Sequence, residues 1–226
     1  LRLEVGDDDF FEILQTWFST YHNGWGVTEE FVDVVNQVTG EEYDWFFHQW
    51  MYCSGTPAVD YAFFFNMNDT SQFRCSAVTQ SNGNSVFEMH VPIVFENAAE
   101  QRDSVLVYAM PEVGTYTYEI PVENWTNYEI DPNSWILSRY HIEHVPELVG
   151  AYAADGAVML EWLPFWPDLI MHYNIYRSVS GGEFELVNGV PVDGTSYYDD
   201  GLVNGETYTY VICAVQNDEW QTQASN

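Results

Sequence analysis

One stretch decides the fold of this chain: FFHQWMYCSGTP, residues 46–57. Before it, apolar residues recur with the period of about 3.6 residues that is typical of an α-helix. After it, apolar and polar residues alternate, as they do in a β-strand. Gly55 and Pro57 end the helical pattern. The sequence therefore predicts a helical segment over residues 1–56 and β-structure beyond it.

Working back from this stretch, the pattern predicts three short amphipathic helices. The first begins at Asp7–Asp9, whose acids complement the positive end of a helix dipole, and ends near Asn23-Gly24. Thr28 is the candidate N-cap of the second helix, and Gly40 lies where a C-cap glycine is expected. The apolar stripe of the first helix comprises Phe10, Phe11, Leu14, Trp17, Phe18 and Tyr21. Three helices this short cannot bury such large side chains alone, so we expect them to end a larger helical domain.

Working forward, alternating runs predict half-buried antiparallel strands over about residues 57–138. The runs are Val59-Tyr61-Phe63-Phe65, Phe87-Met89-Val91-Ile93-Phe95, Val105-Val107-Ala109 and Tyr116-Tyr118-Ile120-Val122. Asn82-Gly83 lies between the first two and is typical of a tight hairpin. We expect a β-sandwich domain over residues 57–144.

A third block begins near Val145-Pro146. Strand-like runs at 157–162, 172–178, 184–189 and 207–215 are separated by glycine-containing turns. Regular short strands with such turns indicate an immunoglobulin-like sandwich over residues 145–226. The expected fold class is thus multidomain: a short all-α segment followed by two all-β antiparallel sandwiches.

The charge balance narrows the classes of partner. The chain has 35 acidic residues and 5 basic ones, all arginine, for a formal net charge of −30. So negative a surface repels phosphate backbones and anionic lipids, which argues against nucleic acid and membrane surfaces as partners. No apolar run approaches the ~20 residues that a spanning helix needs. Because the acids are spread along the chain, we interpret them as a solubility surface suited to high salt, in preference to a surface that attracts cations or basic substrates.

Candidate metal and cofactor residues are few. His141 and His144 have His-x-x-His spacing, but they precede Pro146 in an expected linker or strand, where alternation places them on opposite faces. Asp199 and Asp200 could bind calcium, but two acids before Gly201 are more often a turn. His48 is interpreted as a packed or interfacial residue. We therefore assign no catalytic, cofactor-binding or metal-binding residue within this chain.

The cysteines and the aromatic residues are the remaining candidates for a functional role. Cys53, Cys75 and Cys213 form no C-x-x-C pair, and Cys53 with Cys75 is the only plausible disulfide, which the sequence leaves open. The many tyrosines and tryptophans could form a platform for carbohydrate. Most of them fall at core periodicity, so core packing is the favoured interpretation.

The 46–57 stretch resembles a signature of the aminopeptidase N-like gluzincins, in which a helix reading Phe-Phe-x-Gln-Trp-Leu runs into Gly-x-Pro at the start of a β-sandwich. Leu1–Asp7 and Asp131–Leu137 also resemble that family, so the likeness covers about residues 1–138. It implies a secreted or cell-surface zinc aminopeptidase that removes N-terminal residues from peptides. The His-Glu-x-x-His zinc motif is absent here, so zinc and the catalytic domain are expected upstream of Leu1.

The remainder resembles a bacterial-type fibronectin type III domain. Leu160–Trp162 corresponds to strand B, Tyr173–Arg177 to strand C and Gly205–Ala214 to strand F, with Tyr208 at the tyrosine-corner position. The chain ends about where strand G is expected, so we predict a truncated sandwich with an open edge around Tyr210 and Ile212. Together with the uncovered helical stripe, that edge predicts self-association. The alternative function is a cell-surface binding or structural protein whose sandwiches attach to protein or carbohydrate.

Overall fold

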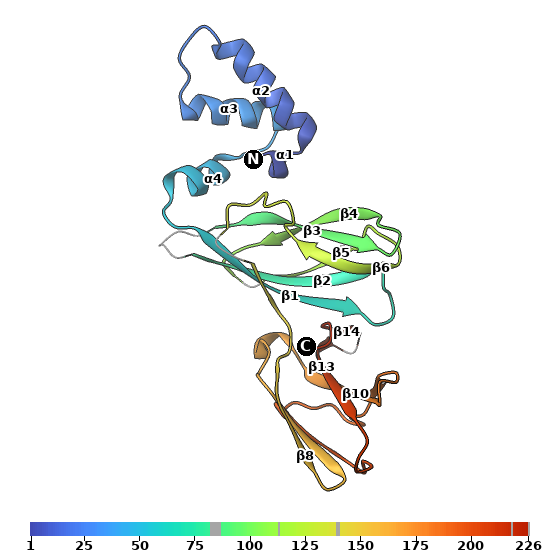
Figure 1. The fold of residues 1–226 in the computed structure, drawn as a ribbon. Coiled ribbons are helices and arrows are strands. Elements are labelled where there is room, and N and C mark those ends of the chain that lie inside the picture. Colours follow the sequence, from blue (N-terminus) through green and yellow to red (C-terminus); the bar gives the residue numbers. More distant parts are fainter. Residues whose placement is uncertain (82–86, 113, 139–140, 218, 226) are drawn as a thin grey trace.

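The computed structural model describes residues 1–81, 87–112, 114–138, 141–217 and 219–225. The chain forms three lobes stacked end to end: a helical lobe, a first β-sandwich and a second β-sandwich (Figure 1). Each lobe has its own cluster of buried apolar residues. The predicted fold class, a short helical segment followed by two β-sandwiches, is confirmed. Among the described residues, no helix combines the length and apolar character needed to span a bilayer.

The helical lobe contains the three predicted helices and, before Asp7, a short helix that the apolar pattern did not predict. Its elements are α1 (Arg2–Val5), α2 (Asp7–Tyr21), α3 (Thr28–Thr39), α4 (Asp44–Phe47) and the π-helical turn η1 (His48–Tyr52). Gly40 ends α3 in the left-handed conformation, with φ 71° and ψ 11°, as expected of a C-cap glycine. The N-cap is Val27, so the expectation for Thr28 was wrong. The Glu30 carboxylate accepts a bond of 3.0 Å from the Val27 N–H and satisfies this helix end instead.

The first sandwich packs two sheets face to face. One contains β1 (Pro57–Asn66), β2 (Gln72–Ser81) and β5 (Gly114–Glu119), and the other has the order β4 (Arg102–Ala109), β3 (Met89–Asn97), β6 (Trp125–Ile130). The core between them is rich in aromatic rings, including Phe63, Phe73 and Phe95. The predicted Asn82-Gly83 hairpin lies outside the described residues.

The second sandwich has the strand order of an immunoglobulin-like fold. One sheet is β12 (Ser196–Asp200), β9 (Ala157–Trp162), β8 (Leu148–Ala154), and the other is β11 (Glu185–Leu186), β10 (His172–Val179), β13 (Tyr208–Asn217), β14 (Trp220–Gln221). A short 3-10 turn, η2 (Pro167–Leu169), precedes β10. The Tyr208 hydroxyl accepts a bond of 2.9 Å from the Val203 N–H, the geometry of a tyrosine corner. The predicted role of Tyr208 is therefore confirmed.

The two sandwiches share a sheet and part of a core. Strand β14 pairs with β13 and also with β1, through Phe65↔Gln221 and Asn66↔Trp220. Residues 57–64 of β1 are buried on both faces, so the expectation of a half-buried strand was wrong for it. Phe63 faces the core of the first sandwich, whereas Phe64 faces that of the second, with its ring 6.1 Å from the ring of Phe165.

One strand departs from the antiparallel pattern. The segment before Pro146 forms β7 (His141–His144), which pairs in parallel with β1, with Val59 opposite His141 and Ala62 opposite His144. The preceding described strand, β6, belongs to the opposite sheet. A chain that crosses between sheets can re-enter beside β1 in the same direction, which a tight hairpin cannot achieve.

The predicted open edge of β13 is not present, so that expectation was wrong. Beyond β14, the Ser225 N–H donates to the Ile212 carbonyl and the Ser225 hydroxyl accepts from the Ile212 N–H, each at 2.9 Å. Thr222 bonds Ala214 in the same way. Residues 220–225 thus cover the edge that the sequence left unassigned.

Candidate functional site

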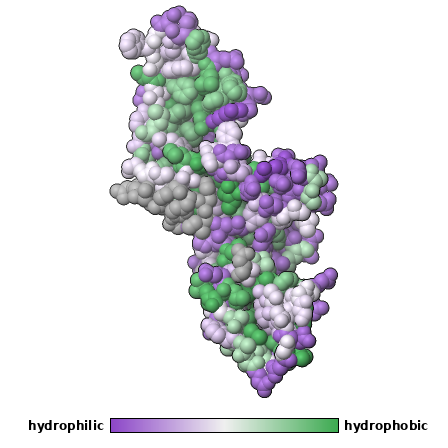
Figure 2. Space-filling model, in the orientation of Figure 1, coloured by the Kyte–Doolittle hydropathy of each residue, from purple (hydrophilic) through white to green (hydrophobic). Residues whose placement is uncertain are grey.

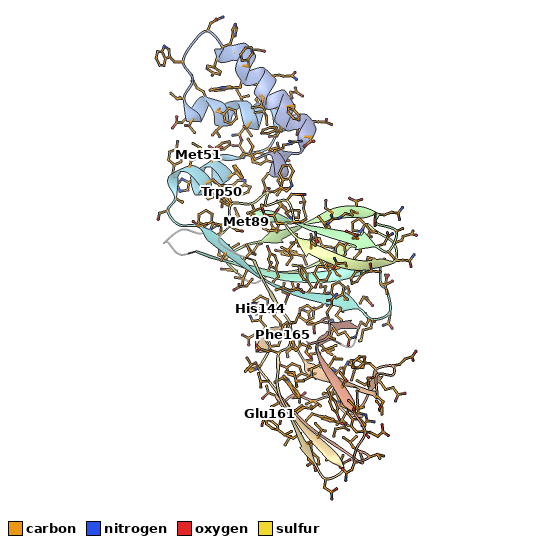
Figure 3. All side chains as sticks on the ribbon, viewed as in Figure 1. Trp50, Met51, Met89, His144, Glu161 and Phe165 are labelled. Carbon is orange, nitrogen blue, oxygen red and sulfur yellow. The ribbon has the colours of Figure 1, made fainter. Side chains whose placement is uncertain are left out.

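The 46–57 stretch forms the upper joint, between the helical lobe and the first sandwich. Gln49, on η1, is buried and donates from Nε2 to the Glu88 carbonyl at 2.7 Å, while Oε1 accepts from the Glu88 N–H at 3.1 Å. The ring of the adjacent Trp50 packs 5.2 Å from that of Phe87, and Trp50 and Met89 lie together at the top of the sandwich (Figure 3). The π-helical turn is closed by the bond from the Cys53 N–H to the His48 carbonyl. The glutamine and tryptophan of the signature therefore anchor the helices on the sheet.

An ion pair adds a second tie to the upper joint. Glu4, at the end of α1, places Oε2 2.7 Å from His90 Nδ1 on β3, and its Oε1 accepts from the His90 N–H at 3.1 Å. The hydrogen bond from Glu4 raises the pKa of His90, against a smaller lowering by burial. This contact favours the protonated imidazole and holds α1 against the sandwich.

The helical lobe leaves one apolar face in solvent. Phe11, Leu14 and Phe18 are 48%, 41% and 68% exposed, whereas Ile13 on the opposite side of α2 is fully buried. Spaced by three and four residues, the three side chains lie on one side of the helix; we call them the uncovered helical face. Hydrophobic residues gather over the visible side of this lobe (Figure 2). The prediction of an uncovered apolar stripe holds for these three residues, whereas it was wrong for Trp17 and Tyr21, which pack against the core of the lobe itself.

An acidic groove of about 460 Å³ separates α3 from α4 and η1. It is lined by Thr28, Glu29, Val32, Asp33, Asp44, Trp45, Phe47, His48 and Tyr52. His48, interpreted from sequence as packed or interfacial, stands in its wall and is exposed. The Asn36 side chain donates to Asp44 at 2.9 Å, so this carboxylate also braces the loop between the two helices.

A groove of different character lies at the lower joint, where the two sandwiches meet. This junction groove has a volume of about 400 Å³. Its lining residues are Phe65, Asn66, Met67, Trp125, Tyr176, Phe184, Val211, Cys213, Gln221, Thr222, Gln223 and Ala224. They come from both sandwiches and from the segment after β14, which brings together positions more than 150 residues apart.

Of the two histidines that the sequence considered for metal binding, the structure describes the side chain of His144. The His144 ring lies 5.2 Å from that of Trp166, tilted by 32°, and its Nε2 is 4.0 Å from Asp60 Oδ1. Figure 3 labels His144 in the region between the sandwiches. The side chain of His141 is outside the described part of the chain. Within the described ranges, no group of three or more His, Cys, Asp or Glu side chains is arranged to hold a metal ion.

Asp199 has a structural role that the sequence did not indicate. It is buried in β12, and both its oxygens bond Arg177, at 3.0 and 2.9 Å. The Tyr210 hydroxyl donates to the same carboxylate at 2.6 Å. The interpretation as a turn residue was wrong, because an ion pair makes burial of an acid tolerable within a strand.

The three cysteines are unpaired thiols, so no Cys53–Cys75 disulfide is formed. Burial raises the pKa of the Cys75 thiol well above its usual range, and it raises the pKa of Cys213 to about 12. Thiols held protonated in this way are poor nucleophiles and poor metal ligands.

Comparison with known proteins finds curated proteins that are similar in sequence and solved structures that are similar in fold. No family model matches. A 72-residue stretch is 42% identical to the amylopullulanase of Thermoanaerobacterium saccharolyticum, covering 31% of this chain and 5% of that protein. The amylopullulanase of Thermoanaerobacter thermohydrosulfuricus is 38% identical over 77 residues, again 5% of its length. The chain thus spans about a twentieth of the curated relatives it matches.

Among solved structures, Legionella pneumophila aminopeptidase A, in complex with aspartic acid, is 16% identical with a TM-score of 0.50, over 63% of this chain and 16% of that chain. Similarity at this level shows the fold alone. A fibronectin type III-like protein from Clostridium thermocellum is 29% identical over 37% of this chain and 85% of its own, with a TM-score of 0.32. The fold of the second sandwich rests on its strand order and tyrosine corner.

Proposed function

We propose that this chain is a non-catalytic part of a secreted or cell-surface zinc aminopeptidase, and that it supports a catalytic domain preceding it in the same polypeptide. The upper joint supports this, because the residues that resemble the aminopeptidase N-like signature are the ones that fasten the helices to the sandwich. The fold likeness to an aminopeptidase over 63% of the chain is consistent with it.

The observation that carries the proposal is the uncovered helical face. Three large apolar side chains on α2 are 41–68% exposed, so each forgoes part of the about 1.5–3 kcal/mol that full burial contributes. Contiguous exposed apolar residues mark surfaces that meet another protein surface. A domain joined to the N-terminal side of α1 is well placed to cover them, since α1 and α2 are consecutive.

This chain would take no chemical step in the reaction. A peptidase of this class holds zinc with two histidines one helical turn apart, and a glutamate beside them activates water. The His-Glu-x-x-His motif does not occur in residues 1–226. Zinc binding and peptide cleavage would therefore belong to the preceding domain.

The test uses the full polypeptide encoded by the gene. We expect it to bind one zinc ion and to hydrolyse aminoacyl-nitroanilides, whereas residues 1–226 alone do neither. Phe18→Asp in the full polypeptide should lower its melting temperature, because the covered face receives a charge. The control is Thr20→Asp, at an exposed α2 position on the other side of the helix. A full polypeptide without zinc or peptidase activity would overturn the proposal.

A second candidate function is attachment to carbohydrate, favoured by the identity of up to 42% with amylopullulanases. Because the shared stretch is 5% of each enzyme, what the proteins have in common is a small module. A glycan array probed with residues 1–226 tests this function. A chain that binds no glycan would count against it.

A further inference from the structure

We propose that the junction groove binds a segment of an uncharged polysaccharide. The proposal rests on the second candidate function and gives it a site. It is independent of whether the preceding domain is a peptidase.

The first argument is charge. The chain carries 35 acidic residues, yet none of the described residues that line the junction groove is charged. The acidic groove of the helical lobe, by contrast, is lined by Glu29, Asp33 and Asp44. A neutral hollow on a strongly negative protein favours a neutral ligand, because a cation would find better partners elsewhere and an anion would be repelled on approach.

The second argument is the arrangement of aromatic rings. The Phe65 and Trp125 rings lie 4.9 Å apart, and the Trp125 Nε1–H donates to the Thr70 carbonyl at 3.1 Å, which fixes the indole. Tyr176 and Phe184 add two rings from the second sandwich. Rings offer apolar faces to the C–H face of a sugar, and rings already held in place lose little entropy on binding.

The third argument is the set of polar groups. Asn66, Gln221 and Gln223 supply amide groups to the lining, whereas the Thr222 hydroxyl is already bonded to the Ala214 N–H and the Gln223 carbonyl. Gln221 Oε1 accepts bonds from the Tyr176 hydroxyl at 3.1 Å and from Asn174 Nδ2 at 3.4 Å, which orients its amide. Neutral donors and acceptors beside aromatic rings suit a ligand rich in hydroxyl groups.

Phe184 offers a clean test. It is 48% exposed and precedes β11, so its removal should leave the fold intact. Affinity electrophoresis of residues 1–226 would use pullulan, soluble starch and hydroxyethylcellulose as neutral probes and polygalacturonate as an anionic one. We expect retardation by at least one neutral probe and none by polygalacturonate. Phe184→Ala should weaken binding about tenfold or more, and Gln223→Ala should weaken it less.

The matched control is Tyr198→Ala, an aromatic residue of the same sandwich that is 53% exposed on the other sheet. It should bind like the unaltered chain. Binding that survives both groove substitutions would overturn the site while leaving the second function standing. No binding to any neutral probe would overturn both. Equal retardation by polygalacturonate would overturn the charge argument. A dimer that Phe184→Ala abolishes, without polysaccharide binding, would assign the groove to a second copy of the chain.

Discussion

The helical lobe and the second sandwich are attached to the first sandwich in opposite ways. The upper joint depends on side chains, chiefly the Gln49 bonds to Glu88 and the Glu4–His90 pair. The lower joint is continuous backbone pairing through β14, with Phe64 inserted in the neighbouring core. A few side-chain bonds are weaker than a shared core, so the two sandwiches should unfold together and the helical lobe should open first.

The largest expected effect is at the lower joint. Phe64→Ala empties a fully buried site between the sandwiches and should cost about 3–5 kcal/mol in the free energy of unfolding. Urea unfolding followed by tryptophan fluorescence measures it. The control, Phe18→Ala, changes the same residue type at a site 68% exposed and should stay within about 0.5 kcal/mol. Equal effects would mean that the shared core contributes little.

Gln49→Ala should destabilise the upper joint. The substitution leaves the N–H and carbonyl of Glu88 without their side-chain partner, at a cost of about 1–3 kcal/mol. Hydrogen exchange should accelerate in α4 and η1, while the two sandwiches keep their protection. Gln15→Ala, at an exposed position of α2, serves as the control. Faster exchange throughout both sandwiches would show that the three lobes form one cooperative unit.

Salt should raise the thermal stability of the folded chain. With a formal charge of −30, acidic groups repel one another, and screening grows as the Debye length falls from about 30 Å at 0.01 M to about 10 Å at 0.1 M. We expect the first thermal transition to rise by several degrees, since about 1 kcal/mol corresponds to roughly 4–8 °C in a cooperative unit as small as the helical lobe. A melting temperature that stays flat or falls with sodium chloride would contradict the prediction.

The smallest expected effect is on pH dependence at the upper joint. Glu4 raises the pKa of His90 above its unfolded value, so this stabilisation is complete below about pH 6.5 and is lost as pH rises through the folded pKa. The His90 side chain is 40% exposed, which limits the effect to less than about 1 kcal/mol. Hydrogen exchange of α1 at pH 6 and pH 8 measures it. His90→Gln should remove the difference; a difference that persists would assign it to another group.

The periodicity of apolar residues predicted the three lobes, because the buried residues of each core recur at the period of the helices or strands that carry them. It identified β3, β9 and β13, whose buried residues alternate or form long apolar runs. Strand β6 was missed because the register shifts at Glu96/Asn97, where β3 pairs with it, which breaks the alternation. Strand β12 was missed because it buries Asp199, and the partner that makes this tolerable, Arg177, is distant in sequence.

The two candidate surfaces also differ in how far they could be predicted from the sequence. The uncovered helical face could be predicted from α2 alone, since its residues are local and regularly spaced. The junction groove could not, because Trp125, Phe184 and Gln221 come together only when the two sandwiches dock. The two-sided burial of β1 is likewise a property of the docked pair. An alternating run cannot reveal that its small or polar side also faces a core.

The placement of β1 limits how this protein can be recombined. A gene breakpoint between residues 144 and 145 cuts an interval between two strands, yet it would separate Phe64 from Phe165 and strip β14 from the end of β1. A first sandwich transplanted alone into another protein would expose the apolar side of β1 and an unpaired strand edge. The two sandwiches should therefore be inherited as a pair, whereas exchange of the helical lobe at the upper joint should cost less stability.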